Sequence, residues 1–176
     1  VSRFDLYEGA VGVAVDGGYA YVTGLGGGLH IINVSDPWAP VPAATYETYW
    51  GLYDVATARN CVYLAQGEKG LLIINAADPA QPVGIGSFDT PGSAEGVAVS
   101  GSYAYVADIE GGLRILDVSD PANPAETGYF DTEGQSRAVV VAGQYAYVAD
   151  GFGGLRIFDV SDPTKPVEAG FYPTFG

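Results

Sequence analysis

An Asp-Pro dipeptide repeats along this chain at a constant interval of 42 residues. The four copies stand at 36–37, 78–79, 120–121 and 162–163. The units align without gaps, and about 22 of 35 positions are identical between 96–130 and 138–172. A fixed period of roughly 20 to 50 residues is typical of architectures in which one supersecondary unit stacks on the next. The fold must therefore consist of four copies of one small unit.

Each unit contains short runs of strand-forming residues separated by glycine-rich turns. In the fourth unit the expected strands are 138–141, 145–149, 155–160 and about 167–172. Valine, tyrosine and isoleucine suit a pleated surface, whereas glycine and proline interrupt it. Strands of about five or six residues joined by short turns form antiparallel meanders. The pattern predicts one four-stranded antiparallel sheet per unit and an all-β fold.

Large apolar residues recur at the same places in every unit. They are Tyr21, Tyr63, Tyr105 and Tyr147; Leu29, Leu71, Leu113 and Leu155; and Ile31, Ile73, Ile115 and Ile157. A period of two within a strand, combined with a period of 42 between units, indicates that the sheets stack face to face. The predicted fold class is therefore a β-propeller of four blades, each of about 42 residues.

The blades are expected at 10–50, 51–92, 93–134 and 135–176. Residues 1–9 are expected to be the outer strand of a preceding blade or a closing strand, because Phe4 is in register with the ends of later outer strands. Three assemblies are open: an excerpt of a larger ring, a closed four-blade ring, and a half ring that pairs with a second copy into eight blades. A free, open monomer is the least favoured state, because it would expose apolar blade faces. The first and third assemblies are favoured over four-blade closure, because blades of this size are common in larger rings.

The Asp-Pro turns have a structural explanation. An Asp side chain closes an Asx turn, and the proline ends the preceding strand. A second polar position, three residues before each Asp, is expected to bond turn backbone in the same way. It is occupied by Asn33, Asn75, Asp117 and Asp159.

Two segments carry a resemblance to a known family. Residues 113–121 read Leu-Arg-Ile-Leu-Asp-Val-Ser-Asp-Pro and 155–163 read Leu-Arg-Ile-Phe-Asp-Val-Ser-Asp-Pro, each preceded by Tyr-Ala-Tyr-Val-Ala-Asp. With them the chain resembles the LVIVD repeat family over nearly its whole length. The first two units depart modestly, with Asn33 and Asn75 in place of the first Asp. The resemblance implies a β-propeller of a bacterial or archaeal surface or secreted protein, hence an extracellular or cell-surface location, and it transfers no catalytic motif.

The formal net charge of −14 argues against several classes of partner. This charge repels a phosphate backbone and an anionic membrane surface, so no nucleic acid partner is expected. No apolar run approaches the roughly 20 residues that span a bilayer, so no membrane insertion is expected. Cys61 is the only cysteine, which excludes an internal disulfide and a thiolate zinc cluster.

Binding is expected on one face of the propeller. The loops that enter each inner strand and the loops between second and third strands share this face and vary between units, and variable loops on a rigid frame commonly carry binding sites. The candidate contacts are Trp50, Tyr53, Asp54, Glu95, Glu110, Arg137 and Phe152. Loop packing is the alternative role for the aromatic residues. Asp54 is expected to be solvated in the channel, or to pair with Arg137 or another cation.

No catalytic constellation is found. His30 is the sole histidine and stands in a blade face away from the loops, which excludes a Ser-His-Asp or Cys-His arrangement. The remaining enzymatic idea is a carboxylate pair of the glycosidase kind. Its members would come from Glu8, Asp54, Glu95 and Glu110. No cofactor or metal site is expected, although calcium is left open because acidic loops offer oxygen ligands.

The sequence thus predicts a non-catalytic extracellular binding or interaction module, whose partner is a protein, a carbohydrate or a second copy of the chain. A purely structural or adhesive repeat array of a surface protein is the alternative. A carbohydrate-active enzyme that uses carboxylates at the channel mouth is a distant third.

Overall fold

The computed structural model describes residues 9–26 and 28–174, and the expected strand at residues 1–9 falls almost wholly outside them. The described residues form four antiparallel sheets of four strands each, and in every sheet the strands lie side by side in chain order. Blade 1 contains β1 (Ala10–Asp16), β2 (Tyr19–Gly24), β3 (Gly28–Asn33) and β4 (Val41–Glu47). Blade 2 contains β5 (Asp54–Ala58), β6 (Cys61–Ala65), β7 (Leu71–Asn75) and β8 (Val83–Phe88).

The second half of the chain repeats this arrangement. Blade 3 contains β9 (Gly96–Ser100), β10 (Tyr103–Ala107), β11 (Leu113–Asp117) and β12 (Ala125–Phe130). Blade 4 contains β13 (Ala138–Ala142), β14 (Tyr145–Ala149), β15 (Leu155–Asp159) and β16 (Val167–Tyr172), with a short 3-10 turn at Gly151–Gly153. The predicted all-β class and four-stranded antiparallel blades are confirmed.

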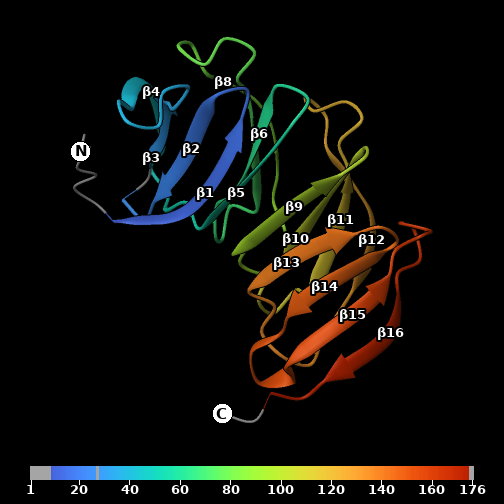
Figure 1. Cartoon of the computed structure of the whole chain (residues 1–176). Coiled ribbons are helices and arrows are strands. Elements are labelled where there is room, and N and C mark those ends of the chain that lie inside the picture. Colours follow the sequence, from blue (N-terminus) through green and yellow to red (C-terminus); the bar gives the residue numbers. More distant parts are fainter. Residues whose placement is uncertain (1–8, 27, 175–176) are drawn as a thin grey trace.

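The blades follow one another in an arc (Figure 1). The inner strands β1, β5, β9 and β13 pack successively against each other, and blades 1 and 4 lie at the two ends of the series. The outer strands β4, β8, β12 and β16 lie away from this inner edge. The architecture is that of a β-propeller arc.

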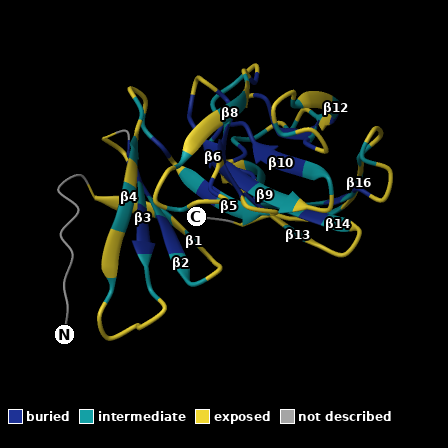
Figure 2. Ribbon diagram, turned by 90° about the horizontal axis from the view of Figure 1, so that it is seen from above, coloured by how far each residue is buried: buried dark blue, intermediate teal, exposed yellow. Residues whose placement is uncertain are grey.

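Three apolar clusters hold neighbouring blades together. We call the side of a blade that meets the following blade its front face, and the opposite side its back face. Between blades 1 and 2, front-face Tyr21, Leu29 and Ile31 pack against back-face residues such as Val55 and Leu64. Equivalent positions form the clusters between blades 2 and 3 and between blades 3 and 4. Figure 2 shows the buried residues between the sheets and the exposed ones on turns and outer strands.

The Asp-Pro turns are built as predicted. In each turn the Asp side chain accepts a hydrogen bond from the backbone amide two residues later. The amide of Trp38 donates to Asp36 at 2.9 Å, and the amide of Ala80 donates to Asp78 at 3.0 Å. The preceding polar position does the same, because the side-chain oxygen of Asn33 accepts from the amide of Ser35 at 3.0 Å. These bonds fix the connection between third and outer strands in all four blades.

Every outer strand carries a β-bulge at the same position. The register shifts between Ile31 and Ile32 in blade 1, and at the corresponding residues of the other three blades. A bulge bends its strand and increases the local twist. The four outer strands therefore curve in the same way.

Candidate functional site

Two sets of loops meet at one end of the blades, and together they form a surface that we call the loop face. The first set leads into the inner strands at 48–53, 91–95 and 133–137, and we call its members entry loops. The second set joins the second and third strands of each blade at 25–26, 66–70, 108–112 and 150–154, and we call its members second-strand loops.

The two sets are bonded to each other across blade boundaries. Gly67 and Ala94 exchange two backbone hydrogen bonds of 2.9 Å, and Ile109 and Ser136 exchange bonds of 3.0 and 3.2 Å. The prediction that these loops share one face is confirmed, and the backbone of the loop face is a fixed frame.

Trp50 and Tyr53 stand on the first loop of this frame and are not buried between blades. Trp50 is 49% exposed and Tyr53 is 38% exposed. The Lys69 ammonium group lies 4.8 Å from the centre of the Trp50 ring, in cation–π range. The Tyr53 ring lies over Gly67, where a side chain would collide with it at 2.9 Å. Both aromatic rings are therefore positioned by the second-strand loop of blade 2.

The expected pair between Asp54 and Arg137 does not form, and Asp54 is only partly solvated. One carboxylate oxygen accepts the amide of Val55 at 2.8 Å, and the other accepts the amide of Val97 in the next blade at 3.0 Å. The side chain is half-buried, and desolvation raises its pKa against the opposing effect of the two amides. Asp54 thus links the inner strands of blades 2 and 3. The sequence did not reveal this, because the depth of an inner-strand side chain depends on the next blade.

Arg137 pairs instead with Glu95. Its guanidinium donates to the Glu95 carboxylate at 2.8 Å and to the Gln135 side chain at 2.9 Å. The Arg137 side chain is 53% exposed, so this bridge between the entry loops of blades 3 and 4 lies on the surface. Glu110 is exposed on the neighbouring second-strand loop.

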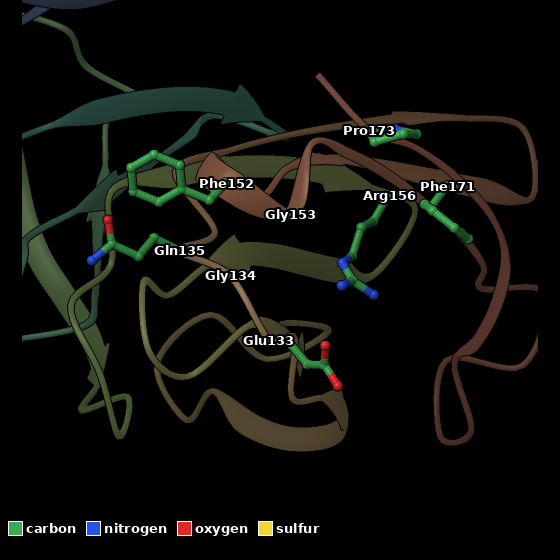
Figure 3. Close-up of a pocket in the computed structure, with 8 residues that line it drawn as sticks. All are labelled: Glu133, Gly134, Gln135, Phe152, Gly153, Arg156, Phe171 and Pro173. Carbon is green, nitrogen blue, oxygen red and sulfur yellow. The ribbon is translucent and has the colours of Figure 1, made fainter. Parts of the chain in front are cut away.

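Phe152 stands at the tip of the 3-10 turn and is fully exposed. It borders a pocket of about 470 Å³ whose other walls include Gln135, Glu133, Arg156 and Phe171. Figure 3 shows Arg156 and Glu133 extending toward the same space, while Phe152 and Phe171 lie on opposite sides of it. The pocket joins the loop face to the outer part of blade 4.

A buried charge network lies behind this pocket and was not among the predicted site residues. Asp150 is fully buried and accepts hydrogen bonds from Thr132 at 2.6 Å, Ser136 at 2.8 Å and Arg156 at 2.9 Å. Arg156 also donates to Glu168 at 3.1 Å. The network ties the entry loop, the second-strand loop and the outer strand of blade 4 together.

Blade 3 contains the matching group around Asp108. This buried carboxylate accepts from Thr90 at 2.5 Å and from the amide of Gly92 at 2.8 Å, and the Arg114 Nε atom lies 4.0 Å away. Desolvation raises the pKa of Asp108, while its hydrogen bonds and Arg114 act in the lowering direction. One signal in the sequence could have revealed both networks: units 3 and 4 each have an Asp followed six residues later by an Arg. At the same two positions unit 1 has Gly and His, and unit 2 has Gln and Leu.

The candidate residues do not form one cluster. Trp50 lies beside Lys69 and Tyr53 over Gly67, both at blade 2. Glu95 and Arg137 bridge blades 3 and 4, and Phe152 borders the pocket of blade 4. Within 9–26 and 28–174, no group of three or more His, Cys, Asp or Glu side chains is arranged to hold a metal ion. The same described residues contain no helix long and apolar enough to cross a membrane.

Stacked four-stranded blades with bonded loops define a repeat protein of the β-propeller class. The model of the LVIVD repeat matches four times, at 9–48, 53–90, 91–132 and 133–174. The chain belongs to the LVIVD repeat family.

No curated protein matches the chain, but solved structures share its fold. The computationally designed Ika4 protein superposes with a TM-score of 0.74 at 8% identity, over 89% of this chain and 94% of that one. The computationally designed Ika8 protein superposes with a TM-score of 0.75 at 7% identity, over 94% of this chain and 50% of that one. At these identities the likeness concerns the fold alone.

Proposed function

We propose that this repeat module is a non-catalytic binding unit that takes its ligand on the loop face. The observation that carries the proposal is the exposure of aromatic side chains where the repeat does not require them. Phe152 is fully exposed, and the aligned residues of the other blades are Gly26, Glu68 and Glu110. Trp50 aligns with Gly92 and Gly134. Tyr, Trp and Phe side chains are enriched at protein interfaces.

The chemistry of the blade 2 loops favours a neutral sugar or a polypeptide segment as ligand. The Trp50 and Tyr53 rings offer flat apolar surface on a loop whose backbone is held by two hydrogen bonds, from the amide of Leu52 to the carbonyl of Gly24 at 3.3 Å and from the amide of Tyr53 to the carbonyl of Ala65 at 2.9 Å. Aromatic rings of this kind give contact area at low entropic cost. The net charge of −14 disfavours a strongly anionic ligand.

Of the four candidate carboxylates, Glu8 lies outside the described residues and Glu110 is exposed. The state of the other two supports a non-catalytic role. Both oxygens of Asp54 are held by backbone amides, and Glu95 is neutralised by Arg137. A glycosidase needs one carboxyl group to donate a proton and another to attack or to activate water. Neither Asp54 nor Glu95 is free for such a task.

An extracellular or cell-surface location is part of the same proposal. It rests on the association of LVIVD repeats with surface and secreted proteins of bacteria and archaea. Secretion of the protein, measured by fractionation of the source cells, tests this part separately.

The test of binding is a screen of the chain against an array of neutral glycans and an array of peptides, followed by titration calorimetry on any hit. The variant Trp50→Ala with Tyr53→Ala should weaken the hit about tenfold or more, as expected for aromatic anchors. The matched control is Trp38→Ala, because Trp38 is 83% exposed but stands on an Asp-Pro turn at the opposite end of the blade. A hit that depends on Trp38 and not on Trp50 would contradict the loop face as the site, and no hit on either array would contradict the module's binding role.

A further inference from the structure

The two ends of the arc expose blade faces that are covered everywhere else in the chain. On the back faces of blades 2, 3 and 4, Val55, Val97 and Val139 are 5%, 4% and 5% exposed. The equivalent residue of blade 1, Val13, is 66% exposed. Val22 of blade 1 is also only half-buried, although the corresponding Val106 and Val148 are fully buried.

The front face of blade 4 shows the complementary pattern. The equivalent leucines and isoleucines of blades 1 to 3 are 0% exposed, whereas Leu155 and Ile157 are only half-buried. Val140 is 63% exposed, although the corresponding Ala56 and Ala98 pack against the next blade. Blade 4 thus presents an intact front face that has no following blade among the described residues.

The open space beside Gly170, on the outer strand of blade 4, indicates which segment would pack on this face. A side chain at Gly86 would collide with the carbonyl of Pro121 in the next blade, and one at Gly128 with that of Pro163. The equivalent Gly170 has nothing within 4 Å of the place where a Cβ atom would stand. By the same period, the residue that would cover Gly170 is Pro37 of a blade 1.

We propose that a second copy of the chain covers both ends, with the front face of blade 4 in each copy packed on the back face of blade 1 in the other. The two junctions are related by one two-fold axis and give a closed ring of eight blades. Each junction repeats an interface already present three times in the chain, with Pro37 of one copy over Gly170 of the other. A second copy is the simplest occupant, because it carries both complementary faces in the required register. The arc also superposes on half of the Ika8 chain, so an arrangement of twice this length is compatible with the fold.

The proposal is independent of the ligand and is tested by the mass of the purified 176-residue chain in solution, by light scattering and sedimentation over a range of concentrations. The expected mass is twice 18.2 kDa, with no larger series. Each of Val13→Asp and Ile157→Asp should weaken dimerisation about 100-fold or more, as a charge at the centre of an apolar interface does. Val83→Asp is the control, because Val83 is similarly exposed, at 57%, on an outer strand away from both faces.

Mixing the two variants gives the sharpest result. In a head-to-tail ring, a heterodimer of Val13→Asp and Ile157→Asp places both substitutions in one junction and leaves the other junction unaltered. Association should therefore be partly restored on mixing, although each variant alone is monomeric. If Ile157→Asp alone remains dimeric, the front face of blade 4 is not part of the interface and the proposal is overturned.

Gly170→Val keeps the test valid if Ile157→Asp fails to fold. Gly170 faces open space within one chain, so the variant should fold with an unchanged circular dichroism spectrum and lose dimerisation. A wild-type chain that stays monomeric at all concentrations would overturn the proposal and would assign the end faces to further blades of a longer polypeptide. A concentration-dependent series of larger masses would overturn closure into eight blades.

Discussion

Removing the Asp150 carboxylate should lower the free energy of unfolding. Replacing both Asp150 and Arg156 by the residues that blade 2 has at these positions should restore most of that loss. Asp150 accepts three side-chain hydrogen bonds, and the Arg156 side chain opposite it is only 16% exposed. Asp150→Ala leaves Arg156 with Glu168 as its remaining charged partner. Breaking a buried ion pair by removing one partner costs about 3–5 kcal/mol of unfolding free energy.

Blade 2 has Gln66 and Leu72 at the positions of Asp150 and Arg156. The double variant Asp150→Gln with Arg156→Leu removes both charges from the interior, and such replacements are often nearly neutral, so we expect it to lie within about 1.5 kcal/mol of wild type. Urea unfolding followed by circular dichroism measures each variant. Glu168→Ala is the control, with an expected loss of about 1 kcal/mol or less, because that partner is partly exposed. A double variant as unstable as Asp150→Ala would refute the reasoning.

Three further results are expected. Gly128→Ala should lower the unfolding free energy by about 1–3 kcal/mol in urea titrations, because the added methyl group meets the Pro163 carbonyl, and an unchanged midpoint would count against the tight packing of blades 3 and 4. Arg59→Gly should raise stability by about 1 kcal/mol, because Arg59 has a φ of 53° in a two-residue hairpin turn, and a lower melting temperature would show that its side chain matters more than its backbone. Hydrogen bonds from the hydroxyl and amide of Ser161 lower the pKa of Asp159. The stability that the ionised Asp159 side chain contributes is therefore present above the ordinary carboxyl pKa, and it is lost as the pH falls through the lower pKa of the folded state. Asp159→Asn should keep the turn, as Asn33 does in blade 1, and should flatten the loss of stability on acidification in urea titrations; an equally steep acid limb would exclude Asp159 as a contributor.

The repeated parts of the fold could be predicted from the sequence because four aligned units give four readings of each position. The expected strand at 145–149 coincides with β14, and the one at 138–141 differs from β13 by one residue. The Asp-Pro turns were predictable for the same reason, since they depend only on local residues such as Asp36 and Pro37.

The candidate site was harder to predict because its geometry arises between blades. The sequence shows that Asp54 is unusual for its position, but not that the amide of Val97 lies 3.0 Å from it. Asp150 and Arg156 are identical to their counterparts in unit 3, so a search for variable loop residues passed over them. Candidate binding residues on the loops are thus found because they differ between units, whereas Asp150 and Arg156 would have been found because they are the same in two units.

The bulge in each outer strand disfavours aggregation through the outer edge of each sheet. An unpaired edge strand is a template for strand addition from another chain, and bulges and prolines are devices that prevent such addition. Here every outer strand is bulged and closely preceded by a proline, such as Pro82 before β8. Edge-to-edge growth into fibrils is therefore disfavoured at all four blades, and contact between molecules is directed to the end faces and the loops.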